Sequence, residues 1–496
     1  MSAHLRTRLL ALPVLLWFAL LVGCGGGSVT GQGPGLGNSS NNALLQGQYA
    51  FALSGQDING PFFVVGSFTA DGQGHLGGNE DVNSKSTPTN GTAAHFGGTY
   101  SVGPDGRGNA VIGIQPGCPN WQFTMISHAH ALLTCLNTNI TGSGTIDLQD
   151  PTAFSNSALK GNYVFGFSGV GSSGGLAVMA GDWSMDGAGT IKNGQTDVND
   201  FGGISLGVPL NGTYSVASTG RGTATFSSSY ATQNFVFYVV NKNDFKFLEI
   251  DHAPAPLVAG EVLNQAPSPF TLASFNGTYA FTLGGIDINN NPFALGGLLP
   301  SDGNGNIASG ILDANDGGTV SLGNALAGPY TMSATGRGAA TLSSSAISFP
   351  LAFYPAANGT VELVNTGGNL VVSGMAKVQT GSPFNTHSFS GNYAVNFSGS
   401  NLGSGGEEDI SGQLSGDGAG NLSGVLDINN SGSIFQGVPL SSSAYTMSAN
   451  GRGTASLNTL SGTFAMQSYQ TDPNTVLFLD IDGNRVVVGL GQKQTF

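Results

Sequence analysis

Asp186-Gly187-Ala188-Gly189 is the stretch that decides the fold, because the same Asp-Gly-x-Gly pattern returns three more times along the chain. The other copies begin at Asp71, Asp302 and Asp417, so that consecutive copies lie 115, 116 and 115 residues apart. A pattern that recurs at a constant distance is typical of tandem copies of one structural unit. We therefore expect four versions of one unit.

Further landmarks recur in the same order within each copy. A Gly-x-Tyr opens the unit, with its tyrosine at Tyr49, Tyr163, Tyr279 and Tyr393. An Asp-x-Asn follows the Asp-Gly-x-Gly pattern, beginning at Asp81, Asp197, Asp313 and Asp427. Next comes a GRG triplet centred on Arg107, Arg221, Arg337 and Arg452. A Gly-x4-Gln closes the unit and ends at Gln149, Gln265, Gln379 and Gln494.

The second unit shows the strand pattern most clearly. Tyr163, Phe165 and Phe167 alternate with smaller residues, which is the period of a strand with one buried face. Turn residues separate seven more predicted strands, over 176–185, 190–198, 210–217, 223–228, 234–240, 245–251 and 257–263. The segment 234–240 is apolar on both faces, and 201–208 is expected to be a longer connection.

Eight short strands joined by short turns predict an antiparallel meander. In about 110 residues such a meander can close into an up-and-down barrel. We predict an all-β fold of four tandem antiparallel modules of about eight strands each, built as small β-barrels, with Ig-like sandwiches as the alternative. The strand count, and an aromatic residue near the start of the first strand, are similar to those of lipocalins and avidins. The many aromatic residues predict a filled interior.

The first residues have the form of a secretory signal. His4, Arg6 and Arg8 precede an uncharged run over 9–22, which is too short for a membrane-spanning helix. The run ends in Leu21-Val22-Gly23-Cys24, which resembles the lipobox of bacterial lipoproteins. This resemblance implies cleavage after Gly23 and a lipid on Cys24, and Gly25 favours the outer membrane or the cell surface.

These observations divide the chain into six parts. Residues 1–23 are the predicted signal peptide, and 24–43 form a Gly/Ser/Asn-rich flexible tether. The four β repeats are expected over 44–150, 158–265, 273–379 and 388–496. Short proline-containing segments between them predict moderately stiff linkers and a shape of four beads on a string.

Composition narrows the possible partners. Removing residues 1–23 leaves 12 basic and 28 acidic residues, a net charge of −16. Such a surface repels nucleic acid, so no nucleic-acid partner is expected. The 40% hydrophobic content, with 29 Phe and 12 Tyr, argues against disorder because it can fill a core in each unit.

The GRG arginines are the sharpest candidate for chemistry, because four of the five arginines after residue 23 occupy this position. They could form a row of anion-binding groups, one in each unit. Alternatively, each could pair with a carboxylate of its own unit, for which Asp81, Asp197, Asp313 and Asp427 are the recurring partners. An identical turn in every copy favours the structural interpretation.

Other candidates are confined to single units or have a structural explanation. Asp-Gly-x-Gly and Asp-x-Asn carry oxygen ligands, but their spacing is that of a hairpin turn rather than an EF-hand. His128 and His130 lack a third ligand, so no metal and no cofactor are predicted. Cys118 and Cys135 flank one predicted hairpin of the first unit and can form a disulfide in an exported protein.

The chain contains no catalytic motif that we recognise, and Glu407 and Glu408 are expected in a loop without an acid partner. We therefore expect a non-enzymatic, lipid-anchored protein with a binding, adhesion or structural role at the cell envelope. Its expected partners are the membrane, through the lipid, and an envelope polysaccharide or surface protein. The alternatives are a lipocalin-like carrier of small apolar ligands and, last, a hydrolase. Recognition is expected in the first connection of each unit, over 56–61, 171–175, 287–292 and 400–408.

Overall fold

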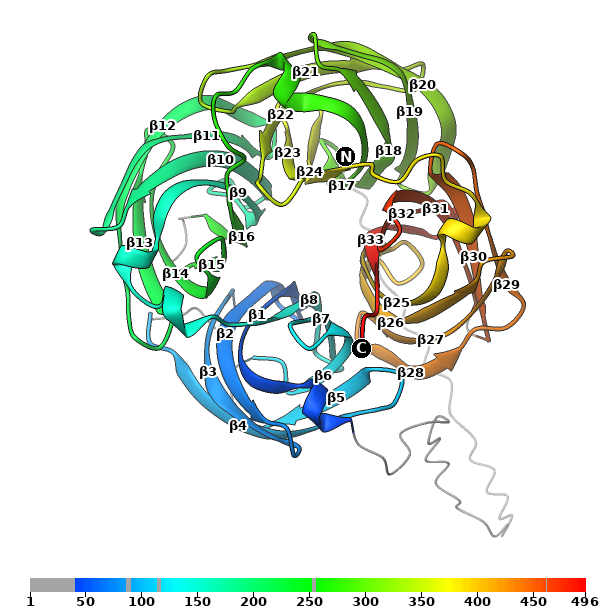
Figure 1. Cartoon of the computed structure of the whole chain (residues 1–496), viewed down its shortest axis with the longest axis horizontal. Helices are drawn as coiled ribbons and strands as arrows, with labels where there is room; N and C mark the ends of the chain where they lie inside the picture. Colours follow the sequence, from blue (N-terminus) through cyan, green and yellow to red (C-terminus); the bar gives the residue numbers. More distant parts are fainter. Residues whose placement is uncertain (1–40, 86–90, 114–116, 252–255, 461) are drawn as a thin grey trace, which may run out of the picture.

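The computed structural model describes residues 41–85, 91–113, 117–251, 256–460 and 462–496. Over these residues the chain forms 33 strands and five short 3-10 helices. The strands make four eight-stranded antiparallel barrels in tandem, as predicted. Figure 1 shows the barrels arranged as a ring around a central axis, so the predicted string of separate beads is wrong. Cys24, the signal peptide and nearly all of the tether lie outside the described residues.

The strands of each barrel follow one another in chain order, and the first strand pairs with the last. Barrel one contains β1 (Gln46–Asp57), β2 (Gly60–Asp71), β3 (His75–Ser84), β4 (Ala94–Val102), β5 (Arg107–Ile112), β6 (Asn120–Ser127), β7 (His130–Leu136) and β8 (Ile140–Leu148). Barrel two contains β9 (Lys160–Val170), β10 (Leu176–Asp186), β11 (Thr190–Asp200), β12 (Gly203–Val216), β13 (Arg221–Ser227), β14 (Thr232–Asn241), β15 (Asp244–Glu249) and β16 (Leu257–Asn264).

The other two barrels repeat this plan. Barrel three contains β17 (Asn276–Asp287), β18 (Pro292–Asp302), β19 (Asn306–Asp316), β20 (Thr319–Met332), β21 (Gly338–Ser343), β22 (Ser348–Pro355), β23 (Thr360–Asn365) and β24 (Leu370–Val378). Barrel four contains β25 (Ser390–Asn401), β26 (Gly406–Asp417), β27 (Asn421–Asn430), β28 (Ser433–Pro439), β29 (Ser443–Met447), β30 (Arg452–Thr459), β31 (Gly462–Asp472), β32 (Thr475–Asp480) and β33 (Arg485–Lys493). Its fourth strand is divided into β28 and β29, which both pair with β27.

Short 3-10 helices precede each barrel at Asn42–Leu44, Pro151–Ala153, Asn156–Ala158, Leu272–Phe275 and Thr386–Ser388. The recurring tyrosine of the fourth strand fixes this segment to its barrel. In barrel two the Tyr214 hydroxyl donates to the Leu159 carbonyl at 2.9 Å. The equivalent hydroxyl of Tyr100 donates to the Leu45 carbonyl at 2.6 Å. The segment therefore covers the end at which the chain enters the barrel.

The Asp-Gly-x-Gly stretch forms the hairpin between the second and third strands. In barrel two, Asp186 Oδ1 accepts the N–H groups of Ala188 at 2.7 Å and Thr190 at 3.0 Å. Gly187 and Gly189 have φ values of 78° and 106°, which residues with a Cβ rarely adopt. The next connection is shorter than expected, because β12 already begins at Gly203 after a tight turn at Phe201 and Gly202.

Aromatic side chains fill the barrel interiors. In barrel two, Phe165 stacks on Trp183 with ring centroids 4.6 Å apart, and Phe237 stacks on Phe247 at 4.7 Å. These four residues are at most 1% exposed and belong to one cluster. Tyr163, Phe165 and Phe167, predicted to form the buried face of the first strand, lie in this cluster. The predicted filled interior is therefore confirmed for barrel two, and the lipocalin-like alternative has no support in this lumen.

All four barrels run in the same direction along the ring axis. The chain enters and leaves barrel one at one end, where Tyr49 pairs with Leu148, and we call this the linker end. The turn between the first two strands lies at the opposite end, where Asp57 pairs with Ile140, and we call this the loop end. The same register holds in the other three barrels.

Neighbouring barrels meet head to tail. Each barrel presents its first strands to strands six to eight of the next barrel, and barrel four presents β25, β26 and β27 to β6, β7 and β8 of barrel one. Between barrels one and two, Phe63 and Val65 pack with Val236, Tyr238 and Val240. Strand six is therefore buried on both faces, one in its own lumen and one in the neighbouring barrel. A repeated head-to-tail contact whose rotation closes gives a ring.

Candidate functional site

The GRG arginines join neighbouring barrels. Arg221 of barrel two forms two hydrogen bonds, of 2.8 and 2.7 Å, with Asp81 of barrel one. Three further pairs repeat this contact around the ring: Arg337 with Asp197, Arg452 with Asp313, and Arg107 with Asp427. The partner carboxylates are those expected from the sequence, but each belongs to the preceding barrel and not to the arginine's own unit. The pair Arg107–Asp427 closes the ring.

Burial makes these pairs structural. The Asp81 side chain is fully buried, and Arg221 is 22% exposed. The Tyr238 hydroxyl also donates to Asp81 at 2.8 Å. Hydrogen bonding to Asp81 raises the pKa of Arg221 above its usual value. With both charges used in the interface, the arginines are not available as a row of anion sites.

The other recurring polar residues also serve the interfaces. Asn199, the Asn of the second Asp-x-Asn, donates to the Leu370 carbonyl of barrel three at 2.7 Å. Gln265, the closing glutamine of barrel two, donates to the Thr335 carbonyl of barrel three at 2.8 Å. Equivalent bonds run from Asn83, Asn315, Asn429, Gln149, Gln379 and Gln494 to the next barrel. The recurring motifs therefore build a ring and mark no reaction centre.

The ring-closing interface, between barrels four and one, is more polar than the others. Its apolar cluster contains Ala394, Ile126 and Leu132, with Leu490 packed against it. Asp409 stands where the other barrels have Phe63, Val178 and Ala294, which lie in the apolar clusters of their interfaces. The end of the chain reinforces this contact, since Phe496 lies against Gly106 as Phe154 lies against Gly220.

The four first connections converge on one opening at the loop end of the ring, which we call the mouth. Three hollows meet there. The axial cavity, of about 480 Å³, is lined from all four barrels, for example by Gln56, Ser168, Ile286 and Ser400. A larger hollow of about 920 Å³ lies toward barrels one, two and three, and one of about 290 Å³ lies between barrels one and four. Gln56 lines all three, so the hollows adjoin.

Small residues keep the axis open. Ser168, Gly284 and Ser398 occupy the same position of the first strand in barrels two, three and four, and each lines the axial cavity. The position that follows also holds glycine, and a Cβ on Gly169 would lie 2.1 Å from the Leu257 carbonyl oxygen of the neighbouring strand. The hollow thus results from a position in the repeat that holds only serine or glycine.

Glu407 is the one ionisable residue among the described residues that line the axial cavity. Two residues along the same strand, Asp409 accepts from Thr141 at 2.5 Å and Ser143 at 2.7 Å across the ring-closing interface. Burial, and then the charge of Asp409, raise the pKa of Glu407 well above its usual value. Burial raises the pKa of Asp409 to about 6 against these hydrogen bonds.

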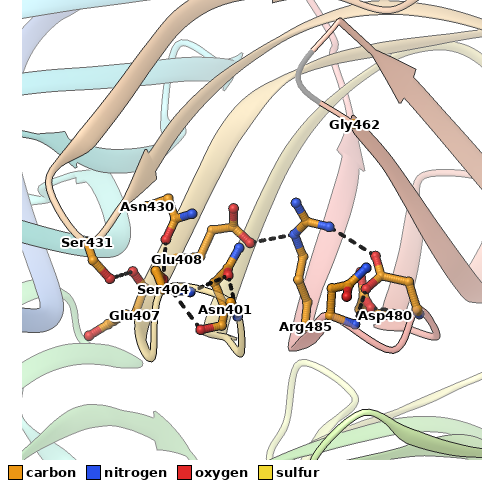
Figure 2. A network of polar contacts seen from close by, with 12 residues as sticks. Asn401, Ser404, Glu407, Glu408, Asn430, Ser431, Gly462, Asp480 and Arg485 are labelled. Atoms are coloured by element: carbon orange, nitrogen blue, oxygen red, sulfur yellow. Dashed lines mark hydrogen bonds and ion pairs between the residues drawn. The ribbon is translucent and has the colours of Figure 1, made fainter.

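Glu408 belongs to a different environment, inside barrel four. Figure 2 shows Glu408 turned toward Arg485, whose Nε donates to it at 2.7 Å, while Glu407 points away on the other face of β26. Arg485 also contacts Asp482 at 3.1 Å and lies over the Phe464 ring, 4.2 Å from its centroid. Both glutamates lie on a strand, so their expected placement in a loop is wrong.

His128 and His130 of barrel one do not act together. His128 Nδ1 lies 3.1 Å from the Leu44 carbonyl oxygen, whereas His130 lies 2.6 Å from Asp147 and 2.9 Å from Gln492 of barrel four. The described residues contain no group of three or more His, Cys, Asp or Glu side chains arranged to hold a metal ion. Cys118 and Cys135 form a disulfide.

Comparisons with known proteins leave the function open. No model of a protein family and no curated protein sequence matches the chain. Among solved structures, transferrin binding protein B from Neisseria meningitidis serogroup B is similar over 74% of this chain and 84% of its own, with 10% identity and a TM-score of 0.19. A mutant of the protein of that name from Haemophilus parasuis Hp5 gives 91% and 96%, with 9% identity and the same TM-score. At this TM-score the arrangements of the chains do not superpose.

No helix of the described part of the chain has the length and apolar character needed to cross a membrane.

Proposed function

We propose that this chain is an exported lipoprotein, held at the outer membrane or cell surface through Cys24, that binds an envelope polysaccharide or surface protein at the mouth of the ring. The observation that carries the proposal is the convergence of four different first connections on one opening. Loops that vary on a repeated, rigid scaffold are where recognition is usually found.

The direction of the barrels supports this use of the mouth. Residue 41, where the described chain begins, hydrogen-bonds Val102 and so lies at the linker end of barrel one. A tether attached there would leave the loop end facing away from the membrane. The recurring charged side chains are occupied in the interfaces, so contacts at the mouth would come from amide, hydroxyl and apolar groups such as Asn59, Asn290 and Ile288.

The anchor is tested by metabolic labelling with a fatty-acid analogue. The wild-type chain should be labelled and Cys24→Ala should not, because the two cysteines of barrel one are joined in a disulfide. Equal labelling of both proteins would remove the anchor from the proposal.

The binding face is tested by blocking it. A polyethylene glycol chain attached to Asn289→Cys would cover the mouth. The matched control carries the same polymer on Ser157→Cys, at the linker end. Asn289 and Ser157 are both exposed in the native chain. Binding to purified envelope material should be lost with the first variant and kept with the second. Equal binding by both would contradict a site at the mouth, and no binding by the unmodified chain would contradict the function itself.

A further inference from the structure

The axial cavity combines one carboxyl group with apolar side chains. Barrel four contributes Glu407 beside Ser398 and Ser400 as well as Val486 and Val488, and barrels two and three contribute Leu176, Val178 and Ile286 together with Ser168 and Ser373. Its volume of about 480 Å³ falls within the range of small-molecule sites, about 300 to 1,000 Å³. A ligand that fits both needs one polar group and one aliphatic part.

The carboxyl group departs from the repeat. The positions equivalent to Glu407 are Pro61, Leu176 and Pro292 in the other barrels. Asp409 likewise replaces an apolar residue and is fully buried. The ring does not require a carboxyl group at the positions of Glu407 and Asp409, since the other three barrels have apolar residues there. Burying a carboxylate is costly unless it is paired. Thr141 and Ser143 donate to Asp409, and a cationic ligand in the cavity would compensate Glu407.

We propose that the axial cavity binds a small aliphatic ammonium compound, with its charged nitrogen against Glu407 and its alkyl chain against the apolar side chains. The ammonium group supplies three donors for the carboxylate and for the serine hydroxyls beside it. The positive charge of the ligand favours the ionised form of Glu407, whose pKa is raised in the empty cavity. Binding therefore releases a proton at pH values where Glu407 is protonated. This site concerns a small molecule inside the ring and does not depend on the macromolecular partner proposed above.

The test is calorimetric titration of the full mature chain with n-hexylammonium, in two buffers that differ in ionisation enthalpy. We expect saturable binding of one molecule per chain with release of up to one proton. The uncharged 1-hexanol should bind at least about tenfold more weakly, because it lacks the charge-assisted hydrogen bond. Equal affinities for the two compounds, or binding without proton release, would contradict an ammonium site.

Three variants separate this site from general attraction to an acidic protein. Glu407→Gln should lower the affinity for n-hexylammonium at least about tenfold and abolish the proton release. Ser168→Phe should exclude the ligand by filling the cavity from the opposite wall while leaving Glu407 in place. Asp57→Asn removes a charge from the neighbouring hollow and should bind as the wild type does. A similar loss in Asp57→Asn and Glu407→Gln would overturn the proposal.

Discussion

Replacing Arg221 by alanine tests the interface between barrels one and two. Asp81 would keep its hydrogen bond from Tyr238 but lose two charge-assisted bonds of 2.8 and 2.7 Å. Removing one partner of a buried ion pair costs about 3 to 5 kcal/mol, because the other charge stays buried without compensation. Arg221 is 22% exposed, so water can partly replace it and we expect a loss of about 3 kcal/mol.

The assay is chemical denaturation of the full mature chain, followed by fluorescence and by hydrogen exchange. Arg221→Ala should speed exchange in β3 of barrel one as well as in β13 and β14 of barrel two. Adding Asp81→Asn should recover part of the lost stability, because the uncompensated charge disappears. Unchanged stability, faster exchange confined to barrel two, or additive losses in the double variant would refute a pair that joins two barrels.

Three further outcomes follow from the structure. Burial raises the pKa of Glu80 to about 8, so the folded chain keeps a proton there that the unfolded chain loses near pH 4.5. Stability should therefore fall as the pH rises from about 4.5 to 8, by at most about 5 kcal/mol, and denaturation of Glu80→Gln should show a smaller fall. Reducing the disulfide between Cys118 and Cys135 should lower the free energy of unfolding of barrel one by about 3 kcal/mol for a loop of this length, and leave the other barrels unchanged. Deleting residues 494–496 should increase hydrogen exchange in β6 and β26, because Gln494 donates to the Met125 carbonyl across the ring-closing interface. Unaltered hydrogen exchange in these strands would contradict a role of the last residues in closing the ring.

The repeat made most of the fold readable from the sequence. Local strand structure depends on neighbours in the chain. It is specified by turn residues at fixed offsets and by the alternation of large apolar and smaller residues in segments such as 163–167. Eight strands per unit then leave few ways to remove the sheet edges, and closure into a barrel is one of them. The segment 201–208 differs from the prediction because Gly203, Ser205 and Gly207, which have weak strand preference, alternate with Ile204, Leu206 and Val208 where β12 pairs with β11.

The ring could not be predicted from the sequence, because each repeat offers the same carboxylate partner to the GRG arginines. Arg221 is 24 residues from Asp197 and 140 from Asp81, and nothing in the composition of a repeat distinguishes the two carboxylates. One signal was present in 234–240, which is apolar on both faces. A strand buried on both faces needs cover outside its own barrel, and here the neighbouring barrel provides it.

The mouth could be anticipated only in part. The first connections stand out as the places where the units differ, but their convergence depends on the ring. Glu407 could not be placed in a cavity from the sequence, because the cavity exists only where four barrels meet.

Electron microscopy of the purified mature chain tests the closed ring most directly. Averaged images of single particles should show four lobes around a central hole, with the fourth lobe in contact with the first. An open arc, or a string of lobes with variable angles between them, would contradict the closed ring and remove the mouth and the axial cavity with it.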